Sequence, residues 1–332
     1  MKKRLFGRDP AGRAVEEVTL ESAEAAVSVL SLGCIVRDWR IDGPAGSLPV
    51  VLGFRSLADY LHHARSHGAL VGRVANRTAG SRFTLGGRTW DLVANEGRHH
   101  LHGGPGGLGH RIWEMEGDSA AGTVQLAYTS AEGEEGYPGM VDFAVTFRLE
   151  GPRLVCEMRG VPDRPTPINL ANHSYYNLGG DGTVQDHVLW LAAPDYTPVD
   201  AELIPTGEIR AVEGTPLDFR EPREIGDTDI DHNLVLDSGR DVRRPSATLY
   251  CPRTDVTLAL TTAEPAIQVF DAARMEIDAP GLDGRRYGRF AGLCLEAQHF
   301  PDSLHRPDWP SIVRTPETPY VQRLDVEIAR TK

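Results

Sequence analysis

The sequence predicts an all-β protein, either an antiparallel β-sandwich or a barrel-like assembly of sheets, and three observations carry this prediction. Apolar and polar residues alternate in many short segments, turn residues separate these segments, and helical spacing is scarce. The 332 residues include 35 glycines and 23 prolines, which are residues that tight turns favour. Short alternating segments between such turns are typical of antiparallel architectures.

The clearest strand covers residues 141–150, VDFAVTFRLE. Every odd-numbered residue from Val141 to Leu149 is apolar. The even-numbered positions include Asp142 and Arg148. Because side chains alternate between the two faces of a strand, this pattern predicts a strand with one buried face. The same alternation occurs in TVQLAYTS at 123–130, RLVCEMRG at 153–160 and DVTLALTT at 255–262.

One segment departs from the alternating pattern and predicts a helix. In SLADYLHHAR, residues 56–65, the apolar residues stand near helical spacing. Ser56 is at the start of this segment, where a serine side chain caps the first turn of a helix. We therefore expect one short helix here in an otherwise β-rich chain.

Nothing in the sequence marks a boundary between domains. The chain contains no internal repeat, no low-complexity segment and no linker-like change in composition. With 40% hydrophobic residues, it can bury one large core or two medium ones. Because large β-sandwiches reach this length, we expect a single domain that spans residues 1–332.

Charge and composition argue against two classes of partner. The net charge is −12, whereas nucleic-acid-binding proteins usually carry a clustered basic surface. The longest apolar-leaning run, AAVSVLSLGCIV at 25–36, is shorter than the roughly 20 residues that a membrane helix needs. The basic first residues lack the apolar stretch of a secretory signal. We expect a soluble, cytoplasmic protein that binds neither nucleic acid nor membrane, and a monomer and a homodimer both stay open.

The four cysteines predict reduced core residues rather than a metal cluster. They are scattered, have strand-like apolar neighbours, and include no CxxC pair of the kind found in zinc sites. The four are Cys34, Cys156, Cys251 and Cys294.

Four polar segments interrupt the alternation and point to a site. Polar groups that are buried without partners cost about 1–3 kcal/mol each, so such residues either satisfy one another or wait for a ligand. The segments are GRVANR at 72–77, HHLHGG at 99–104, NHSYYN at 172–177 and LEAQHFPD at 295–302.

Glu296 and His173 are the most informative members of these segments. Alternation places Glu296 on the same strand face as Cys294 and Gly292, and small neighbours suggest a lined pocket. Taken alone, Glu296 is equally consistent with an exposed carboxylate. His173 alone fits a hydrogen-bonded structural histidine as well as a proton-transfer group.

The histidines of HHLHGG raise the question of a metal site. His100 and His102 are two residues apart, so on a strand they would face the same way, and with a third imidazole they could hold zinc or iron. No carboxylate stands at a spacing that completes such a ligand set. We therefore expect no metal, and the alternative is an imidazole that donates a hydrogen bond to an oxygen-rich ligand.

Eight segments spread along the chain form a recognisable series. In order, they are GRVANR, HLHGG, EEGYPG, NLANHSYYNLGG, YTPVDAELIPTGEI, GTPLDF, DHN and LCLEAQHFPDSLHRPDWPS. With these segments, the sequence resembles the aldose 1-epimerase (galactose mutarotase) family over nearly its whole length. The resemblance implies a large antiparallel β-sandwich of the supersandwich type and an isomerase that interconverts the α and β anomers of aldoses such as glucose or galactose. It also implies a small-molecule aldose as substrate and no cofactor.

The resemblance also implies roles for individual residues. Glu296 takes the base role, His173 takes the acid role, and His102 polarises the substrate near its ring oxygen. Exchange of anomers requires a base for the anomeric hydroxyl and an acid for the ring oxygen, each worth about 10² to 10⁴ in rate. Asn172 or Ser174 is expected to orient the His173 ring. The expected sugar-binding residues are Asn76, Arg77, Asp231, Gln268 and Tyr175, the last of which also fits an ordinary core aromatic.

Two segments depart from the family pattern, so the sequence does not predict which aldose is preferred. Three rival functions also remain. His99 stands where many members have asparagine, and VFDAARME at 269–276 replaces a tyrosine-threonine-glycine-asparagine run. A non-catalytic carbohydrate-binding protein of the same fold would lack the acid–base pair. A sugar-phosphate epimerase would need further basic residues. A glycoside hydrolase would use two carboxylates, for which Glu296 and Asp231 are the candidates.

Overall fold

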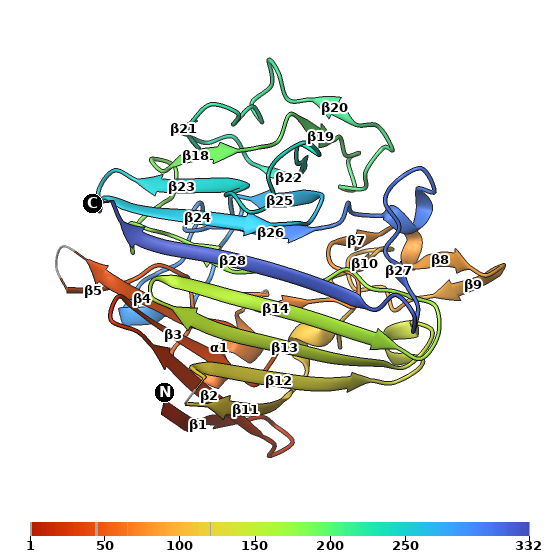
Figure 1. Ribbon diagram of the computed structural model, residues 1–332, viewed down its shortest axis with the longest axis horizontal. Helices are drawn as coiled ribbons and strands as arrows, with labels where there is room; N and C mark the ends of the chain where they lie inside the picture. The colour runs from red at the N-terminus through yellow and green to blue at the C-terminus, as the bar shows by residue number, and fades with distance from the viewer. Residues whose placement is uncertain (1, 44–45, 65, 120, 332) are drawn as a thin grey trace.

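The structure is a computed structural model that describes residues 2–43, 46–64, 66–119 and 121–331. Strands dominate the described chain, and every ladder between its named strands is antiparallel. Two broad curved layers of strands face each other, with the shorter strands of β7 to β10 at one end (Figure 1). The prediction of an all-β antiparallel fold is therefore confirmed.

The largest sheet of the described residues contains the strands that the sequence predicts most clearly. The alternating segment 141–150 forms β13, in which Val141, Phe143, Val145 and Phe147 are buried. Leu149, at the end of the same face, is half-buried. The order across this sheet is β11 (Glu114–Asp118), β12 (Thr123–Ser130), β13 (Val141–Glu150), β14 (Arg153–Pro162), β28 (Tyr320–Arg330), β24 (Val256–Thr262), β23 (Ala247–Cys251), β18 (Val188–Leu191) and β21 (Arg223–Glu224).

A five-stranded sheet from the N-terminal part of the described chain packs against this large sheet. Its apolar face, which includes Val27 and Trp39, meets Phe143, Phe147 and Val326 in the main core. Removal of this apolar surface from water is the main stabilising contribution to such a sandwich. The order is β1 (Lys2–Arg8), β2 (Ala14–Glu21), β3 (Ala25–Leu30), β4 (Val36–Gly43) and β5 (Gly46–Pro49).

A third sheet carries the residues of the candidate site. Leu293, Leu295 and Ala297 of its strand β26 belong to the main core, so Glu296 and Cys294 face the other way, as the alternation predicts. Across the described residues the order is β17 (Tyr175–Tyr176), β26 (Leu293–Gln298), β25 (Ala266–Phe270), β22 (Asp231–Val235), β19 (Asp195–Thr197) and β20 (Arg210–Ala211).

Short elements complete the described chain. The paired short strands are β6 (Leu70–Val71) with β16 (Ala171–Asn172), β7 (Arg77–Thr78) with β10 (His100–Leu101), β8 (Arg82–Leu85) with β9 (Arg88–Asp91), and β15 (Thr166–Pro167) with β27 (Val313–Arg314). The 3₁₀ turns are η1 (Ala79–Ser81), η2 (Leu108–His110), η3 (Glu134–Gly136), η4 (Leu282–Gly284) and η5 (Ser303–His305).

The helix α1 (Leu57–His62) lies where the sequence predicts it and is shorter than the predicted segment. The side chain of Ser56 caps it by accepting a hydrogen bond from the backbone N–H of Asp59 at 3.2 Å. Leu57 is buried, whereas Leu61, one helical turn later, is 42% exposed. The helix ends at His62, so the prediction is right in its start and too long at its end. Arg65, the last residue of the predicted segment, lies outside the described residues.

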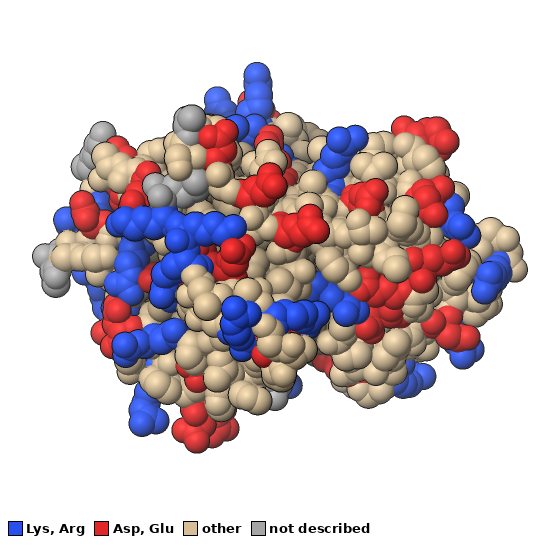
Figure 2. All heavy atoms as spheres, turned by 90° about the horizontal axis from the view of Figure 1, so that it is seen from below, with Lys and Arg blue, Asp and Glu red and all other residues tan. Residues whose placement is uncertain are grey.

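The surface mixes charges of both signs. On the face shown in Figure 2, basic side chains gather in the left half with acidic ones among them, and acidic side chains predominate in the right half. In the described ranges, no helix has the length and apolar character needed to cross a bilayer. All four cysteines are buried and free, as predicted.

Candidate active site

The register of the site-bearing sheet places two rows of side chains on one face. Glu296 of β26 lies directly opposite Gln268 of β25, and Gln268 lies opposite Asn233 of β22. Because side chains opposite each other across a ladder point to the same side, these polar groups share one face. A second row runs alongside in the order Tyr175, Cys294, Phe270 and Asp231.

Two loops bring further polar groups over this face and hold each other. The backbone N–H of Asn76 donates to Nδ1 of His102 at 3.1 Å. In return, the N–H of His102 donates to the carbonyl of Asn76 at 3.0 Å. Arg77, the next residue, pairs with Leu101 between β7 and β10. GRVANR and HLHGG are thus one structural unit, although the sequence separates them.

A glycine contact and a buried arginine fix this unit from behind. A Cβ on Gly103 would lie 1.8 Å from the carbonyl oxygen of Gly72, so the two loops meet at a distance that only glycine allows. Arg73, which is 2% exposed, donates to the carbonyls of Pro138 and Gly139 at 2.9 Å each. Four further hydrogen bonds join its guanidinium to Ser130 and to Ala131. The motif EEGYPG therefore has a structural role, which is to receive Arg73.

All eight residues that the sequence predicts for the site line one pocket of about 190 Å³. Ser66, Leu101 and Phe270 complete its lining. The structure thus brings the predicted residues together, while their individual roles stay predictions. The eight are Glu296, His173, His102, Asn76, Arg77, Asp231, Gln268 and Tyr175.

Glu296 and His173 lie side by side at this pocket. Oε1 of Glu296 is 3.5 Å from Nε2 of His173, and their side chains are 2% and 6% exposed. The second oxygen of Glu296, Oε2, is buried and accepts no hydrogen bond from any described residue. An unsatisfied buried acceptor beside a pocket is suited to a ligand hydroxyl, because a hydroxyl would remove the cost of its desolvation.

The ring of His173 is oriented by a residue other than those expected. Nδ1 of His173 is 3.4 Å from Sγ of Cys294. Burial raises the pKa of the Cys294 thiol, so the sulfur keeps its proton. Oδ1 of Asn172 instead accepts hydrogen bonds from the N–H and the hydroxyl of Ser174. The expectation that Asn172 or Ser174 orients the ring is wrong, because these two side chains satisfy each other.

Burial displaces both pKa values of the pair toward the uncharged forms. It raises the pKa of Glu296 well above its ordinary value, and the nearby Asp231 raises it further while Arg77 opposes the shift. Burial also lowers the pKa of His173 to about 4. A protonated carboxyl beside a neutral imidazole carries one exchangeable proton, which is on the carboxyl. A carboxylate beside an imidazolium also carries one, which is on the ring. Between its two titrations the pair therefore carries the one proton that acid–base exchange needs.

This proton count predicts an unusual pH profile. Below about pH 4, His173 gains a proton while Glu296 keeps its own, so no base is left. For the anomer exchange that the family resemblance implies, we expect kcat/KM to stay flat through pH 6.5, the ordinary pKa of histidine, and to fall by half only near pH 4. Polarimetry at a series of pH values, corrected for the buffer rate, measures this profile. An inflection near pH 6.5 would contradict it, and circular dichroism at each pH controls for unfolding.

The third histidine of the pocket is held as a hydrogen-bond donor. Ligand atoms of His102, His173 and Glu296 lie within 4.8 Å of one another, a spacing that a metal ion could bridge. Burial, followed by His173 and Arg77, lowers the pKa of His102 well below its ordinary value, so its ring is neutral. Because Nδ1 accepts from Asn76, the ring proton is on Nε2. A protonated nitrogen offers no lone pair to a metal, and this arrangement favours donation to a substrate oxygen.

His100 takes no part in the pocket. Its Nδ1 bonds the carbonyl of Val93 at 2.6 Å, and its Nε2 is 2.8 Å from the hydroxyl of Tyr137. Strand β10 ends at Leu101, and His102 has a left-handed backbone with φ of 53°, so the two imidazoles do not face the same way. The alternative in which His100 and His102 act together as metal ligands is wrong for this reason.

Arg77 is held by a carboxylate that the sequence did not reveal. Nε and Nη2 of Arg77 donate to the two oxygens of Glu96 at 2.6 and 3.0 Å. Nη1 of Arg77 is 3.9 Å from Oδ2 of Asp231. The other oxygen of Asp231 accepts from Nε2 of Gln268 at 2.6 Å. Glu96 looks like an ordinary loop carboxylate in the sequence, and no spacing signal connects it to the pocket.

Of the two segments that depart from the family pattern, one lies outside the pocket and the other contributes a residue to its lining. His99 does not line the pocket: its Nδ1 accepts from the N–H of Gly80, and its Nε2 is 3.4 Å from Oε1 of Glu202. His99 therefore accepts a hydrogen bond from the segment that carries Gly80 and lies close to the segment that carries Glu202. In VFDAARME, Phe270 lines the pocket, while Asp271 accepts hydrogen bonds from the N–H groups of Ile230 and Ala273.

The fold and the pocket together define an antiparallel β-sandwich protein with a paired carboxylate and imidazole in a polar cavity. The family model described as Aldose 1-epimerase matches residues 16–326. The galactose mutarotase of Mus musculus is 37% identical over 95% of this chain and 95% of its own length. The aldose 1-epimerase of Escherichia coli (strain K12) is 32% identical over 91% of each chain. The chain belongs to the aldose 1-epimerase family.

Solved structures agree with this assignment. A GalM/aldose epimerase homologue from C. elegans superposes with a TM-score of 0.90 at 27% identity and covers 96% of this chain and 100% of its own. The galactose 1-epimerase of Lactobacillus acidophilus NCFM gives a TM-score of 0.86 at 26% identity, with 100% and 99% covered. The predicted galactose mutarotase-like sandwich is therefore confirmed.

Proposed function

We propose that this aldose 1-epimerase exchanges the α and β anomers of an uncharged aldose, with Glu296 and His173 as its proton-transfer pair. The observation that carries the proposal is the 3.5 Å contact of these two groups at one polar pocket. The anomeric hydroxyl and the ring oxygen of an aldose are both bonded to C1. Two neighbouring proton-transfer groups are therefore suited to reach both oxygens at once.

The reaction follows from this placement. With its proton on His173, the carboxylate of Glu296 removes the proton of the anomeric hydroxyl, and His173 protonates the ring oxygen as the bond from C1 to that oxygen breaks. The open-chain aldehyde rotates about C1–C2 and presents its other face. The hydroxyl of C5 then returns its proton to His173 as it attacks C1, and Glu296 protonates the new anomeric oxygen. No electron is gained or lost, so these residues suffice.

The remaining pocket residues support the binding of a sugar. We propose that Nε2 of His102 donates a hydrogen bond to a substrate oxygen near His173, because the two rings lie with their centroids 5.2 Å apart. Tyr175 stacks on His173 at 5.0 Å, so its ring fixes the imidazole and offers an apolar edge. We propose that Asn76, Asp231 and Gln268 meet the hydroxyls, because amide and carboxylate groups can pair with one or two each.

Polarimetry on freshly dissolved α-D-glucose and α-D-galactose tests the activity. We expect the optical rotation to relax to its equilibrium value at a rate that rises in proportion to enzyme concentration. Heat-denatured protein serves as the control for buffer catalysis. Relaxation no faster than in buffer for every aldose tried would refute the proposed function.

The rival functions receive less support from the geometry. A non-catalytic binding protein has no need of a buried carboxylate that contacts an imidazole and leaves one oxygen unsatisfied. A glycoside hydrolase would need a second free carboxylate, whereas Asp231 is engaged by Gln268 and lies near Arg77. The acid–base pair therefore favours anomer exchange.

The charges around Arg77 favour uncharged sugars over sugar phosphates. Among the described residues that line the pocket, Arg77 is the one arginine, and no lysine joins it. Glu96 binds two of its nitrogens. Asp231 stands on its other side. A dianion would meet an arginine whose charge is already balanced, together with the negative Asp231. We infer that Glu96 disfavours anionic aldoses by this compensation.

Glu96→Gln is expected to weaken this discrimination. Loss of one negative charge near Arg77 favours an anionic ligand by roughly 1.4 kcal/mol, or about tenfold. We expect kcat/KM for D-galacturonate, relative to D-galactose, to rise about tenfold in the variant, as measured by exchange NMR of the anomers. Glu327→Gln, which removes the partner of Arg153 on the large sheet, is the matched control and should leave the ratio unchanged. An unchanged ratio in Glu96→Gln would contradict the role of Glu96.

Two wider expectations are also proposals. The pocket residues come from positions between 66 and 296, which supports one domain over 1–332 as the functional unit. Four free buried cysteines support a reducing compartment such as the cytoplasm. A monomer or a homodimer stays a prediction.

A further inference from the structure

A second cavity adjoins the sugar pocket. It has a volume of about 130 Å³ and shares Ser66 and His102 with the sugar pocket as lining residues. Its further walls come from α1 and from the segments around Ile35 and His110. Because Ser66 and His102 line both spaces, a group attached to the sugar on that side would lie toward the second cavity.

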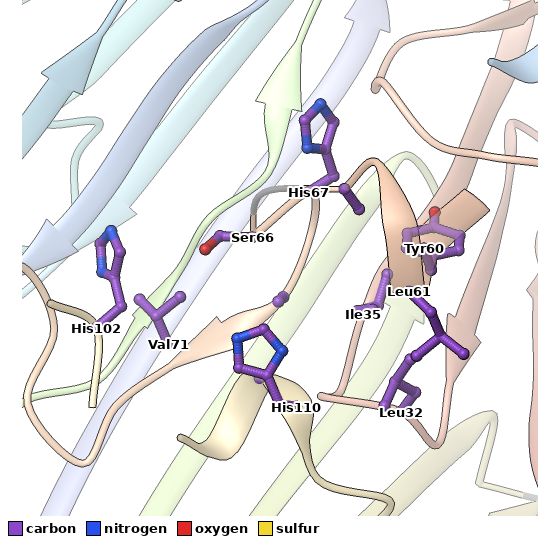
Figure 3. Close-up of a pocket in the computed structure, with 12 residues that line it drawn as sticks. Leu32, Ile35, Tyr60, Leu61, Ser66, His67, Val71, His102 and His110 are labelled. Atoms are coloured by element: carbon purple, nitrogen blue, oxygen red, sulfur yellow. The ribbon is translucent and has the colours of Figure 1, made fainter. Parts of the chain in front are cut away.

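The second cavity is polar at one end and apolar at the other. Figure 3 shows His102 and Ser66 toward one side, and Tyr60, Leu61 and Leu32 together on the opposite side. The hydroxyl of Tyr60 accepts a hydrogen bond from the backbone N–H of Phe54, so the phenolic oxygen is already engaged. The end farther from His102 therefore suits an apolar group rather than a second set of hydroxyls.

A stack of rings forms the boundary between the two spaces. The ring of His67, which lines the second cavity, stacks on Tyr175 with centroids 4.3 Å apart. Tyr175 stacks in turn on His173 at 5.0 Å. An occupant of the second cavity thus lies against the same stack that supports the proposed acid. The space is pre-formed by packed rings and needs no movement to exist.

The bonding within the sugar ring determines which of its substituents points toward the second cavity. In the proposed reaction Glu296 serves the oxygen on C1, and His173 serves the ring oxygen. The ring oxygen is bonded on its far side to C5, which carries C6 in a hexose. The C6 group therefore leaves the ring on the side of His173 and its neighbour His102.

We propose that the second cavity is a subsite for an apolar substituent on the C6 oxygen of an aldose, such as a short alkyl ether. This inference rests on the proposed anomer exchange. The polar end accommodates the ether oxygen, and the end with Leu32, Tyr60 and Leu61 receives the carbon chain. Each methylene that becomes fully buried raises affinity about fourfold.

Exchange NMR of the anomers tests the subsite in the unmodified enzyme. The probes are D-galactose, 6-O-butyl-D-galactose and 2-O-butyl-D-galactose, each measured for kcat/KM. We expect the 6-O-butyl ether to exceed D-galactose about tenfold, mainly through a lower KM, and the 2-O-butyl ether to gain nothing. Equal or lower kcat/KM for the 6-O-butyl ether would overturn the proposal. A gain confined to the 2-O-butyl ether would overturn it as well, since the substituent would leave from another carbon.

A variant that fills the cavity adds a second measurement. Leu61 is 42% exposed and lines the cavity from α1, so Leu61→Trp reduces its volume. We expect the ratio of kcat/KM for the 6-O-butyl ether over D-galactose to fall to about one. Val242→Trp, at a surface residue that is 47% exposed and outside both cavities, is the matched control and should keep the tenfold ratio. An unchanged ratio in Leu61→Trp would overturn the proposal.

The two levels of inference fail differently. Absence of catalysed exchange with every sugar would refute the proposed function. Catalysed exchange of D-galactose without any preference for the 6-O-butyl ether would refute the subsite alone. If Leu61→Trp does not fold, the comparison of the three sugars with the unmodified enzyme still decides the matter.

Discussion

Glu296→Gln is expected to slow anomer exchange by at least about 10². The amide has nearly the same shape as the carboxyl group but cannot take the proton of the anomeric hydroxyl. Because the interaction with the reacting hydroxyl changes during the reaction, most of the loss should be in kcat rather than in KM. Polarimetry with D-galactose measures both. Turnover close to that of the unmodified enzyme would assign the base to another residue.

The stability of this variant provides its control and a further expectation. The folded-state pKa of Glu296 is raised well above its ordinary value by burial and by Asp231. An acid with a raised pKa favours the folded state at low pH and costs stability as the pH rises toward the folded pKa, because the unfolded chain ionises first. Glutamine does not ionise. We therefore expect Glu296→Gln to have a higher Tm than the unmodified protein at pH 8 and a similar Tm near pH 4.

His173→Asn is expected to reduce kcat by at least about 10² for a different reason. Asparagine can still donate a hydrogen bond, but it cannot deliver a proton to the ring oxygen and take it back. It also leaves the Cys294 thiol without its imidazole partner, which is now 3.4 Å away. Removal of His173 takes away the titration at about pH 4, so the acid limb of the pH profile should change as well.

A matched variant separates this effect from a general loss of histidine. His62→Asn changes an exposed histidine in the last turn of α1 and should leave kcat within about twofold, as surface substitutions usually do. Circular dichroism of both variants checks the fold. If His173→Asn kept normal turnover, or if both variants lost activity equally, the acid role would lie elsewhere.

The strands and the face of the proposed base could be predicted because they depend on local periodicity. The alternation in 141–150 defines β13, and alternation around Glu296 separates it from Leu295. Ser56 marks the start of α1 because a serine cap acts within one turn. Such signals act over a few residues and do not depend on the rest of the chain.

The partners of the site residues could not be predicted because they come from distant parts of the chain. Cys294 meets His173 across 121 positions, and alternation gives no indication of which loop will cover a strand. The Glu96 carboxylate reaches Arg77 from a loop that resembles any solvated turn. His102 acquires its tautomer from the backbone N–H of Asn76, a contact that depends on the left-handed conformations of both residues. These features follow from tertiary packing, which overrides local preference.

Because Arg73 is buried, the loop that carries Asn76 depends on a turn that does not line the pocket. The carbonyls that receive the guanidinium lie in the connection between β12 and β13. An insertion or loop graft there would leave a cation stranded inside the protein, three positions before Asn76. Anyone who redesigns this enzyme by exchanging surface loops should therefore keep the connection at 131–140 intact, even though it does not line the pocket.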